Sequence, residues 1–261
     1  PGLSKFFVSL EDDLITKSGS KWINDYYQKE VAKPESKQKR ELKSRRIKNA
    51  IEEAQRNSDN SGASSRRSTE EYDESIRIQR QIIYSRRKAI IDHPDFDYKY
   101  FLELLSEGLD YYCKKHPFKN RADFFRFILD NISYSCEEIP ESLDVSDLAQ
   151  IKEFVAQLLA DEYQQKKIKI KDPETFSQFQ RIAVLKAVDD CWVEQVDYLQ
   201  QFQSLVISQG YAQKNPVYEF HKEAFASYQK MNEDIKLQTI KNIALSYINV
   251  DSKGRLEVYF G

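Results

Sequence analysis

The last third of the chain carries an apolar periodicity that limits its fold more narrowly than any other feature. Asp172-Pro173 is a good helix start, and after it apolar residues recur at steps of three or four. The recurring residues are Ile182, Leu185, Val188, Trp192, Val196, Leu199, Phe202 and Val206. This spacing predicts a single helix of roughly 35 residues, about 50 Å long.

A second apolar stripe follows directly. Gly210 ends the first helix and Asn215-Pro216 opens the next one. Its apolar residues are Val217, Phe220, Ala224, Tyr228, Met231 and Ile235. We therefore predict a hairpin of two long antiparallel helices with a short loop between them. Tyr211 lies near the tip of this hairpin, where an aromatic residue has little core to join.

Composition favours a mostly all-α fold. Only 7 Gly and 7 Pro occur in 261 residues, under half the usual share of roughly 12%, so β-sandwiches and barrels lack their turn residues. The 15 Phe and 16 Tyr supply a core and exclude disorder throughout. No apolar run reaches the ~18 residues of a membrane-spanning helix. Cys113, Cys136 and Cys191 lack the spacing of zinc or redox sites, which is typical of a reduced cytosolic compartment.

Charge is unevenly distributed, although the net charge is only −2. Residues 34–90 carry 15 basic and 9 acidic side chains, whereas residues 91–165 carry 7 and 16. The basic excess is concentrated in Lys37, Lys39, Arg40, Lys43, Arg45, Arg46 and Lys48. Such a cluster can contact phosphate or anionic lipid, or it can be the solvated face of a long helix. Aromatic residues are missing from it, so nucleic acid is not an expected partner.

The first 92 residues predict helices that are interrupted at Pro34 and again at residues 57–65. Residues 5–10 (KFFVSL) form a β-prone run ahead of an acidic stretch that suits a helix N-terminus. After Pro34 a long charged helix is expected, and the polar segment 57–65 (NSDNSGASS) predicts a flexible loop within it. Ser68 and Glu71 have the spacing of a capping box, which would restart the helix.

Further helices are expected between residues 95 and 165. Residues 122–132 concentrate Phe and Ile side chains, which favours a buried helix in a small module, and residues 145–165 predict another helix.

No catalytic or metal-binding motif is visible. The chain has no G-x-x-x-x-G-K-[ST], G-x-G-x-x-G, H-E-x-x-H or G-x-S-x-G. His93, His116 and His221 lie far apart in the sequence. Glu137-Glu138 and Asp189-Asp190 are pairs only in sequence, because adjacent residues of a helix face different directions, and solvated side chains are expected there. The sequence therefore predicts no catalytic residue and no metal site.

Four stretches resemble SecA, the family of ATP-driven motors of bacterial protein export. Residues 1–13 (PGLSKFFVSLEDD) resemble the end of its second nucleotide-binding domain, and residues 50–56 (AIEEAQR) the start of its helical scaffold. Residues 71–73 (EYD) with 79–87 (QRQIIYSRR) resemble the continuation of that scaffold. Residues 210–216 (GYAQKNP) resemble the tip of its two-helix finger. Their order and spacing agree with the family.

The resemblance implies a layout in five parts, with the nucleotide-binding and preprotein-clamping domains of the family lying upstream. The chain is thus expected to be a fragment. Its parts would be a short α/β tail of the second nucleotide-binding domain (1–33), a long scaffold helix (34–92), a helical wing domain (93–170), a two-helix finger with scaffold return (171–248) and a C-terminal tail or tag remnant (249–261). Residues 256–261 can be a native strand or the remnant of a protease site.

Departures from the general SecA, such as Gln209 in place of arginine, resemble the accessory SecA of Gram-positive bacteria. That paralogue exports selected preproteins, such as serine-rich glycoprotein adhesins. The resemblance implies a protein at the cytoplasmic face of the cell membrane. Its expected partners are a SecY-type channel, a preprotein, the upstream motor domains and accessory secretion proteins, with anionic lipid as a further candidate. ATP and Mg²⁺ would be cofactors of the full-length ATPase, with none in this part. The alternatives are the same region of the general SecA, or a non-motor helical interaction module that uses its basic face.

The resemblance also implies where the contacts lie. The family's tyrosine that matches Tyr211 contacts the moving preprotein; alternatively, Tyr211 folds back as a cap on the hairpin. The expected tip contacts are Gly210, Tyr211, Ala212, Gln213 and Lys214, and the expected finger core is Trp192, Val196, Leu199 and Phe202. Candidate contacts to an anionic surface are Lys37, Lys39, Arg40, Lys43, Arg45 and Arg46.

Overall fold

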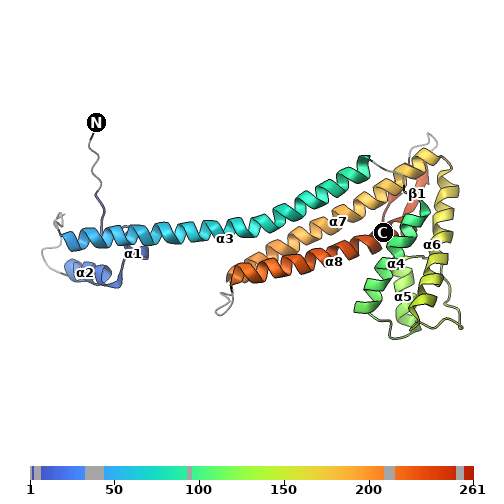
Figure 1. The fold of residues 1–261 in the computed structure, drawn as a ribbon, viewed down its shortest axis with the longest axis horizontal. Helices are drawn as coiled ribbons and strands as arrows, with labels where there is room; N and C mark the ends of the chain where they lie inside the picture. Colours follow the sequence, from blue (N-terminus) through green and yellow to red (C-terminus); the bar gives the residue numbers. More distant parts are fainter. Residues whose placement is uncertain (1, 3–6, 33–43, 93–95, 209–214, 251–255) are drawn as a thin grey trace. The chain divides into compact units, whose positions relative to one another are not determined.

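The computed structural model describes residues 2, 7–32, 44–92, 96–208, 215–250 and 256–261 (Figure 1). Among these residues helices predominate and the strands form one two-stranded sheet, which confirms the mostly all-α fold. The chain divides into two compact units, Pro1–Asp73 and Glu74–Gly261. The long helix α3 (Arg45–Asp92) contains the boundary between them.

The first unit contains α1 (Asp13–Ser18), α2 (Lys21–Val31) and the N-terminal part of α3. Ile15, Ile23, Ala50 and Ala54 form its small buried core. The expected strand at residues 5–10 is wrong for the part that the structure describes, because Phe7–Ser9 belongs to no strand and helix α1 follows at once. Residues 3–6 lie outside the described residues.

The expected loop at residues 57–65 is also wrong, because α3 continues through it without a break. Ser68 is consequently an interior helical residue and not an N-cap. Each residue of the segment other than Gly62 costs at most about 0.7 kcal/mol relative to alanine, and none is proline. A break would need a second nucleation and would leave four unpaired backbone groups at each new end. Continuing an established helix therefore costs less than interrupting it.

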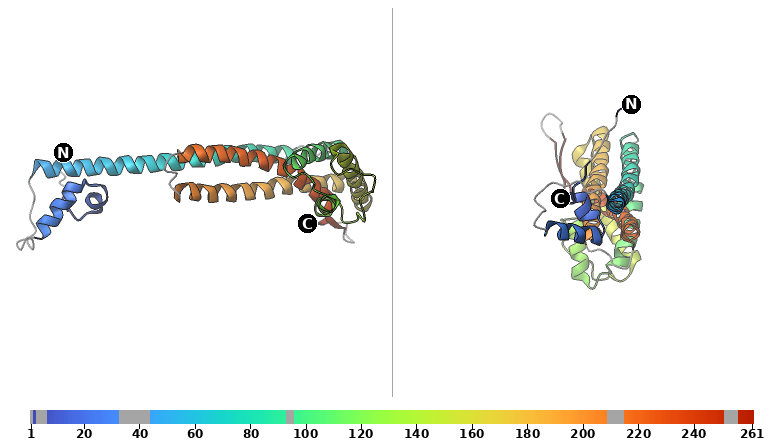
Figure 2. Two further views of the ribbon diagram at one scale, coloured as in Figure 1. Left: turned by 90° about the horizontal axis from the view of Figure 1, so that it is seen from below. Right: turned by 90° about the vertical axis from the view of Figure 1, so that its left-hand side faces the viewer.

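The second unit is organised around the predicted hairpin. Helices α7 (Pro173–Ser208) and α8 (Pro216–Leu245) run side by side (Figures 1 and 2). The Asp172 carboxylate accepts a hydrogen bond from the backbone N–H of Thr175 at 2.8 Å, and the Asn215 side chain accepts one from Val217 at 3.0 Å. Both helices therefore begin at the residues that the sequence indicated. Ile182 is an exception to the predicted stripe, since its side chain is 43% exposed.

Helices α4 (Tyr98–Lys115), α5 (Arg121–Asn131) and α6 (Leu148–Ile170) gather around the C-terminal half of α8 (Figure 1). The expected buried helix is α5, whose Phe124, Phe127 and Ile128 lie in the core. At its start, the Arg121 guanidinium donates to the carbonyl oxygens of Ile139, Pro140, Glu141 and Leu143. One side chain thus holds the loop that connects α5 to α6.

Strands β1 (Tyr247–Val250) and β2 (Leu256–Tyr259) form an antiparallel pair in which Tyr247 faces Tyr259 and Val250 faces Leu256. The C-terminal β-prone run is therefore a strand. Its partner β1 directly follows α8. Because β1 has only four residues, the periodicity of the sequence does not distinguish it from the end of that helix.

Candidate functional site

The half of the hairpin nearest the connection between its helices is held by stacked rings. Phe202 of α7 stacks on Phe220 of α8 with ring centroids 6.3 Å apart, and on Tyr198 at 6.2 Å. Of the expected finger core, Leu199 and Trp192 are buried, while Val196 and Phe202 are half-buried. These rings tie the two helices together close to the tip.

A polar contact reinforces the same region. The Tyr198 hydroxyl donates a 2.6 Å hydrogen bond to the Glu223 carboxylate of α8. This hydrogen bond, followed by burial and by the negative charge of Glu223, raises the pKa of Tyr198 to about 12. The hydroxyl therefore keeps its proton, and the contact persists at any physiological pH.

A buried polar cluster joins three helices, and we define it as Gln79 of α3, Gln195 of α7 and Ser227 of α8. The Gln79 amide donates to the carbonyl oxygen of Ala224 at 2.8 Å, and its side-chain oxygen accepts from Gln195 at 3.1 Å. Gln195 also lies 2.9 Å from the Ser227 hydroxyl, which in turn donates to the Ala224 carbonyl at 3.3 Å. Gln79 and Gln195 are only 6% and 5% exposed, so these bonds replace water that burial excludes.

Further contacts flank the buried polar cluster along α3. Arg87 forms a bidentate ion pair with Asp189 of α7, at 2.5 and 2.9 Å. The Ser75 hydroxyl lies 2.7 Å from Nδ1 of His221 on α8. The expectation that Asp189 is merely solvated is therefore wrong: its side chain is 41% exposed but paired with a cation.

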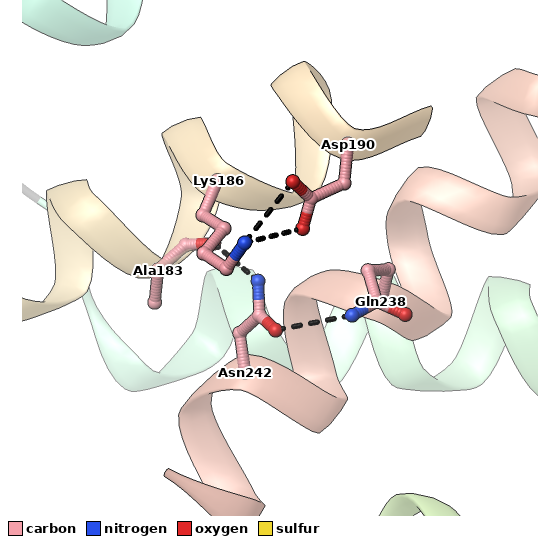
Figure 3. Close-up of polar contacts among 5 residues, drawn as sticks. All are labelled: Ala183, Lys186, Asp190, Gln238 and Asn242. Carbon is pink, nitrogen blue, oxygen red and sulfur yellow. Dashed lines mark hydrogen bonds and ion pairs between the residues drawn. The ribbon is translucent and has the colours of Figure 1, made fainter. Parts of the chain in front are cut away.

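Closer to helices α4–α6, the hairpin has its own polar contact without α3 (Figure 3). Asn242 of α8 is 1% exposed and donates to the Ala183 carbonyl of α7 at 3.0 Å. Its oxygen accepts from Gln238 at 3.1 Å. Beside it, Lys186 pairs with Asp190 at 2.8 Å. The adjacent aspartates Asp189 and Asp190 therefore pair with different cations, Arg87 and Lys186.

The expected tip residues Gly210, Tyr211, Ala212, Gln213 and Lys214 lie outside the described residues, as do Lys37, Lys39, Arg40 and Lys43 of the basic cluster. Arg45 is exposed at the start of α3. The Arg46 guanidinium lies 4.5 Å from the ring centroid of Trp22, so this cation is engaged within the first unit.

Sequence reasoning missed Gln79, Gln195 and Ser227, although a signal for Gln79 was present. Ile76, Ile83 and Ile90 recur every seven residues and are all buried, and Gln79 stands three residues after the first of them. In a heptad pattern that offset is a second core position. A glutamine there predicts a buried polar group that requires a partner.

The described residues hold no cluster of His, Cys, Asp or Glu side chains that could bind a metal ion. In the same part of the chain, no helix combines the length and the apolar character required to cross a bilayer.

Comparison with known proteins gives a consistent result. Residues 41–246 match the SecA Wing and Scaffold domain family. The whole chain is 37% identical to Protein translocase subunit SecA 2 of Streptococcus gordonii over 264 residues and 37% identical to that of Streptococcus sanguinis (strain SK36) over 260, covering 33% of each relative. Protein translocase subunit SecA 2 of Staphylococcus aureus (strain N315) is 25% identical over 260 residues, again with 33% of its length covered. The chain thus spans about a third of the length of the curated relatives it matches.

Proposed function

Since the chain belongs to the SecA family through its wing and scaffold domain, we propose that it is the scaffold, wing and finger part of an accessory SecA motor. In this proposal α3 is the scaffold helix, α4–α6 form the wing, and α7–α8 form the finger. The motor exports selected preproteins, such as serine-rich adhesins, through a SecY-type channel. It acts as a cytoplasmic protein at the inner face of the cell membrane, together with accessory secretion proteins.

The observation that carries the proposal is the packed hairpin with polar contacts from α3 to both of its helices. Stacked rings near the tip and a buried polar cluster behind them make the hairpin stiff, so it can present its connecting loop to another molecule. Tyr211 in that loop would offer an amphipathic ring that contacts many polypeptide sequences without requiring one.

ATP hydrolysis belongs, in this proposal, to the remainder of the motor. No phosphate-binding loop motif occurs in these 261 residues, so they lack the backbone cradle and the lysine with which such a loop binds ATP and Mg²⁺. This part would instead receive a conformational change from the nucleotide-binding domains and transmit it mechanically through α3.

The test is a photo-crosslinking experiment with the full-length motor. A crosslinking amino acid replaces Tyr211, and the motor is stalled on its channel with either a serine-rich adhesin or a general secretory precursor. Crosslinks to the adhesin alone support the accessory motor, whereas crosslinks to both precursors indicate a general one. Absence of crosslinks to either would contradict the proposed contact.

Substitution separates contact from folding. Tyr211→Ala should lower translocation of the adhesin while leaving the melting temperature of the protein unchanged. Tyr218→Ala is the matched control, since Tyr218 is 64% exposed but belongs to the first turn of α8. A parallel fall of stability and transport in Tyr211→Ala would show that the ring caps the hairpin instead.

A further inference from the structure

The apolar contacts of α3 do not determine its axial position on the hairpin. Within the second unit its buried apolar side chains are Ile76, Ile83 and Ile90, which are identical and seven residues apart. If α3 slid by one heptad, Ile76 would occupy the place of Ile83 and bury the same kind of surface. A repeat of this kind leaves registers nearly equivalent in coiled coils, where one buried polar residue often selects among them.

The polar contacts, in contrast, are satisfied in one register only. Gln79 is the single buried polar side chain of α3 in the part of the helix that the structure describes. At its present level it meets Gln195 and the Ala224 carbonyl. One heptad away, Gln79 and Gln195 would be buried without each other, and an unpaired buried amide is costly.

The flanking pairs agree with the same alignment. Along α3, Ser75, Gln79 and Arg86 meet residues of increasing number on α8, namely His221, Ala224 and Asn232. Gln79 and Arg87 meet residues of decreasing number on α7, namely Gln195 and Asp189. Helix α3 is therefore parallel to α8 and antiparallel to α7, and every contact fits one common register. The exposed pairs alone are weak, because water screens them.

We propose that the buried polar cluster of Gln79, Gln195 and Ser227 fixes the axial register of the hairpin on the C-terminal part of α3, so that the two move as one body. The three residues act as positioning residues. The inference concerns this chain alone and holds whether or not the hairpin contacts a preprotein. Its consequence for a motor is that any displacement of this part of α3 reaches the hairpin tip without loss through sliding.

The test replaces all three polar side chains with apolar ones of similar size, in the variant Gln79→Met/Gln195→Met/Ser227→Ala. No buried amide is then left unpaired, so the melting temperature should stay close to that of the wild type. Spin labels at Lys88 and Gln200, both exposed, report the position of α3 along α7. Cys113 and Cys136 are first replaced by serine, since both are half-buried and would otherwise accept label.

The wild-type chain should give one narrow distance between the labels. The triple variant should give a second population displaced by about 10 Å, the length of seven helical residues. A single unshifted distance in a folded triple variant would overturn the proposal, since the cluster would then contribute only stability. Asn242→Ala is the matched control: it removes a buried amide between α7 and α8, lowers the melting temperature and should leave the distance single.

Disulfide trapping gives a second readout that does not require the triple variant to fold. Arg87→Cys/Asp189→Cys traps the present register, and Arg80→Cys/Asp189→Cys traps a register shifted by one heptad. Gln79→Met should raise the yield of the shifted disulfide about fivefold or more, because one unpaired buried group no longer opposes the shift. An unchanged yield would contradict the proposal independently.

Discussion

The same substitution should have opposite effects at two helical glycines. Gly62 lies in the interior of α3 and Gly108 in the interior of α4. Replacement by alanine removes the conformational freedom that glycine has in the unfolded chain, and it favours the helix by about 1 kcal/mol at either position. The surroundings decide whether that gain survives.

At Gly62 the new methyl group meets little. Its nearest neighbour would be the Arg66 guanidinium at 3.2 Å, the mobile end of a long side chain. The full gain of about 1 kcal/mol should therefore remain, which lowers the population of locally opened helix about fivefold.

At Gly108 the methyl group would lie 2.8 Å from Cδ2 and 3.0 Å from Cγ of Leu237 on α8. The first distance is shorter than a carbon contact allows and the second is unusually tight, so α4 and α8 must separate or the Leu237 side chain must shift. Overpacking of this kind costs about 1–3 kcal/mol, which exceeds the propensity gain. We expect Gly108→Ala to destabilise the second unit by about 1 kcal/mol net.

Hydrogen exchange measured by mass spectrometry resolves the two helices separately. Peptides covering residues 58–68 should exchange about fivefold more slowly in Gly62→Ala. Peptides of α4 should exchange faster in Gly108→Ala, and urea unfolding followed by Trp192 fluorescence should shift to lower concentration. If Gly62→Ala leaves exchange unchanged, residues 57–65 are not helical in solution. If Gly108→Ala stabilises the protein, the close approach of α4 and α8 is wrong.

Two further substitutions test local chemistry. The pKa of Tyr198 is raised to about 12 in the folded protein, so the protonated hydroxyl stabilises the folded state. This stabilisation is complete below the unfolded pKa near 10 and is lost as the pH rises toward 12. In urea unfolding, the difference in stability between wild type and Tyr198→Phe should therefore shrink between pH 10 and 12. The change should be well under about 1 kcal/mol, because the ring is partly exposed. A constant difference would argue against the hydrogen bond to Glu223. Lys171 ends α6 with φ of 60°. Lys171→Gly should raise stability by about 1 kcal/mol by relieving this conformation, and a fall in melting temperature would refute it.

The hairpin could be predicted from the sequence because its information is local. Asp172-Pro173 and Asn215-Pro216 open helices by capping and by the fixed φ of proline, and the apolar stripes follow the helical period. The buried helix α5 could be predicted for the same reason. Residues 57–65 misled the prediction because their low propensities point to a loop, whereas the helix continues through them.

The contacts of α3 with the hairpin could not be predicted, since they join segments more than 100 residues apart. Gln79 meets Gln195, and Arg87 meets Asp189. Propensity and periodicity describe a residue's neighbours in the chain, and neither says which polar groups a distant helix will bring.

The sequence by itself determined the helical class, the hairpin and the absence of nucleotide-binding motifs, because periodicity, capping residues and motifs are read along one chain. Only the tertiary structure decided which register α3 takes on the hairpin and what an added methyl group would meet at Gly62 and at Gly108. The physical reason is that a helix forms from contacts three or four residues apart, whereas burial and hydrogen-bond pairing depend on what another helix places opposite each side chain.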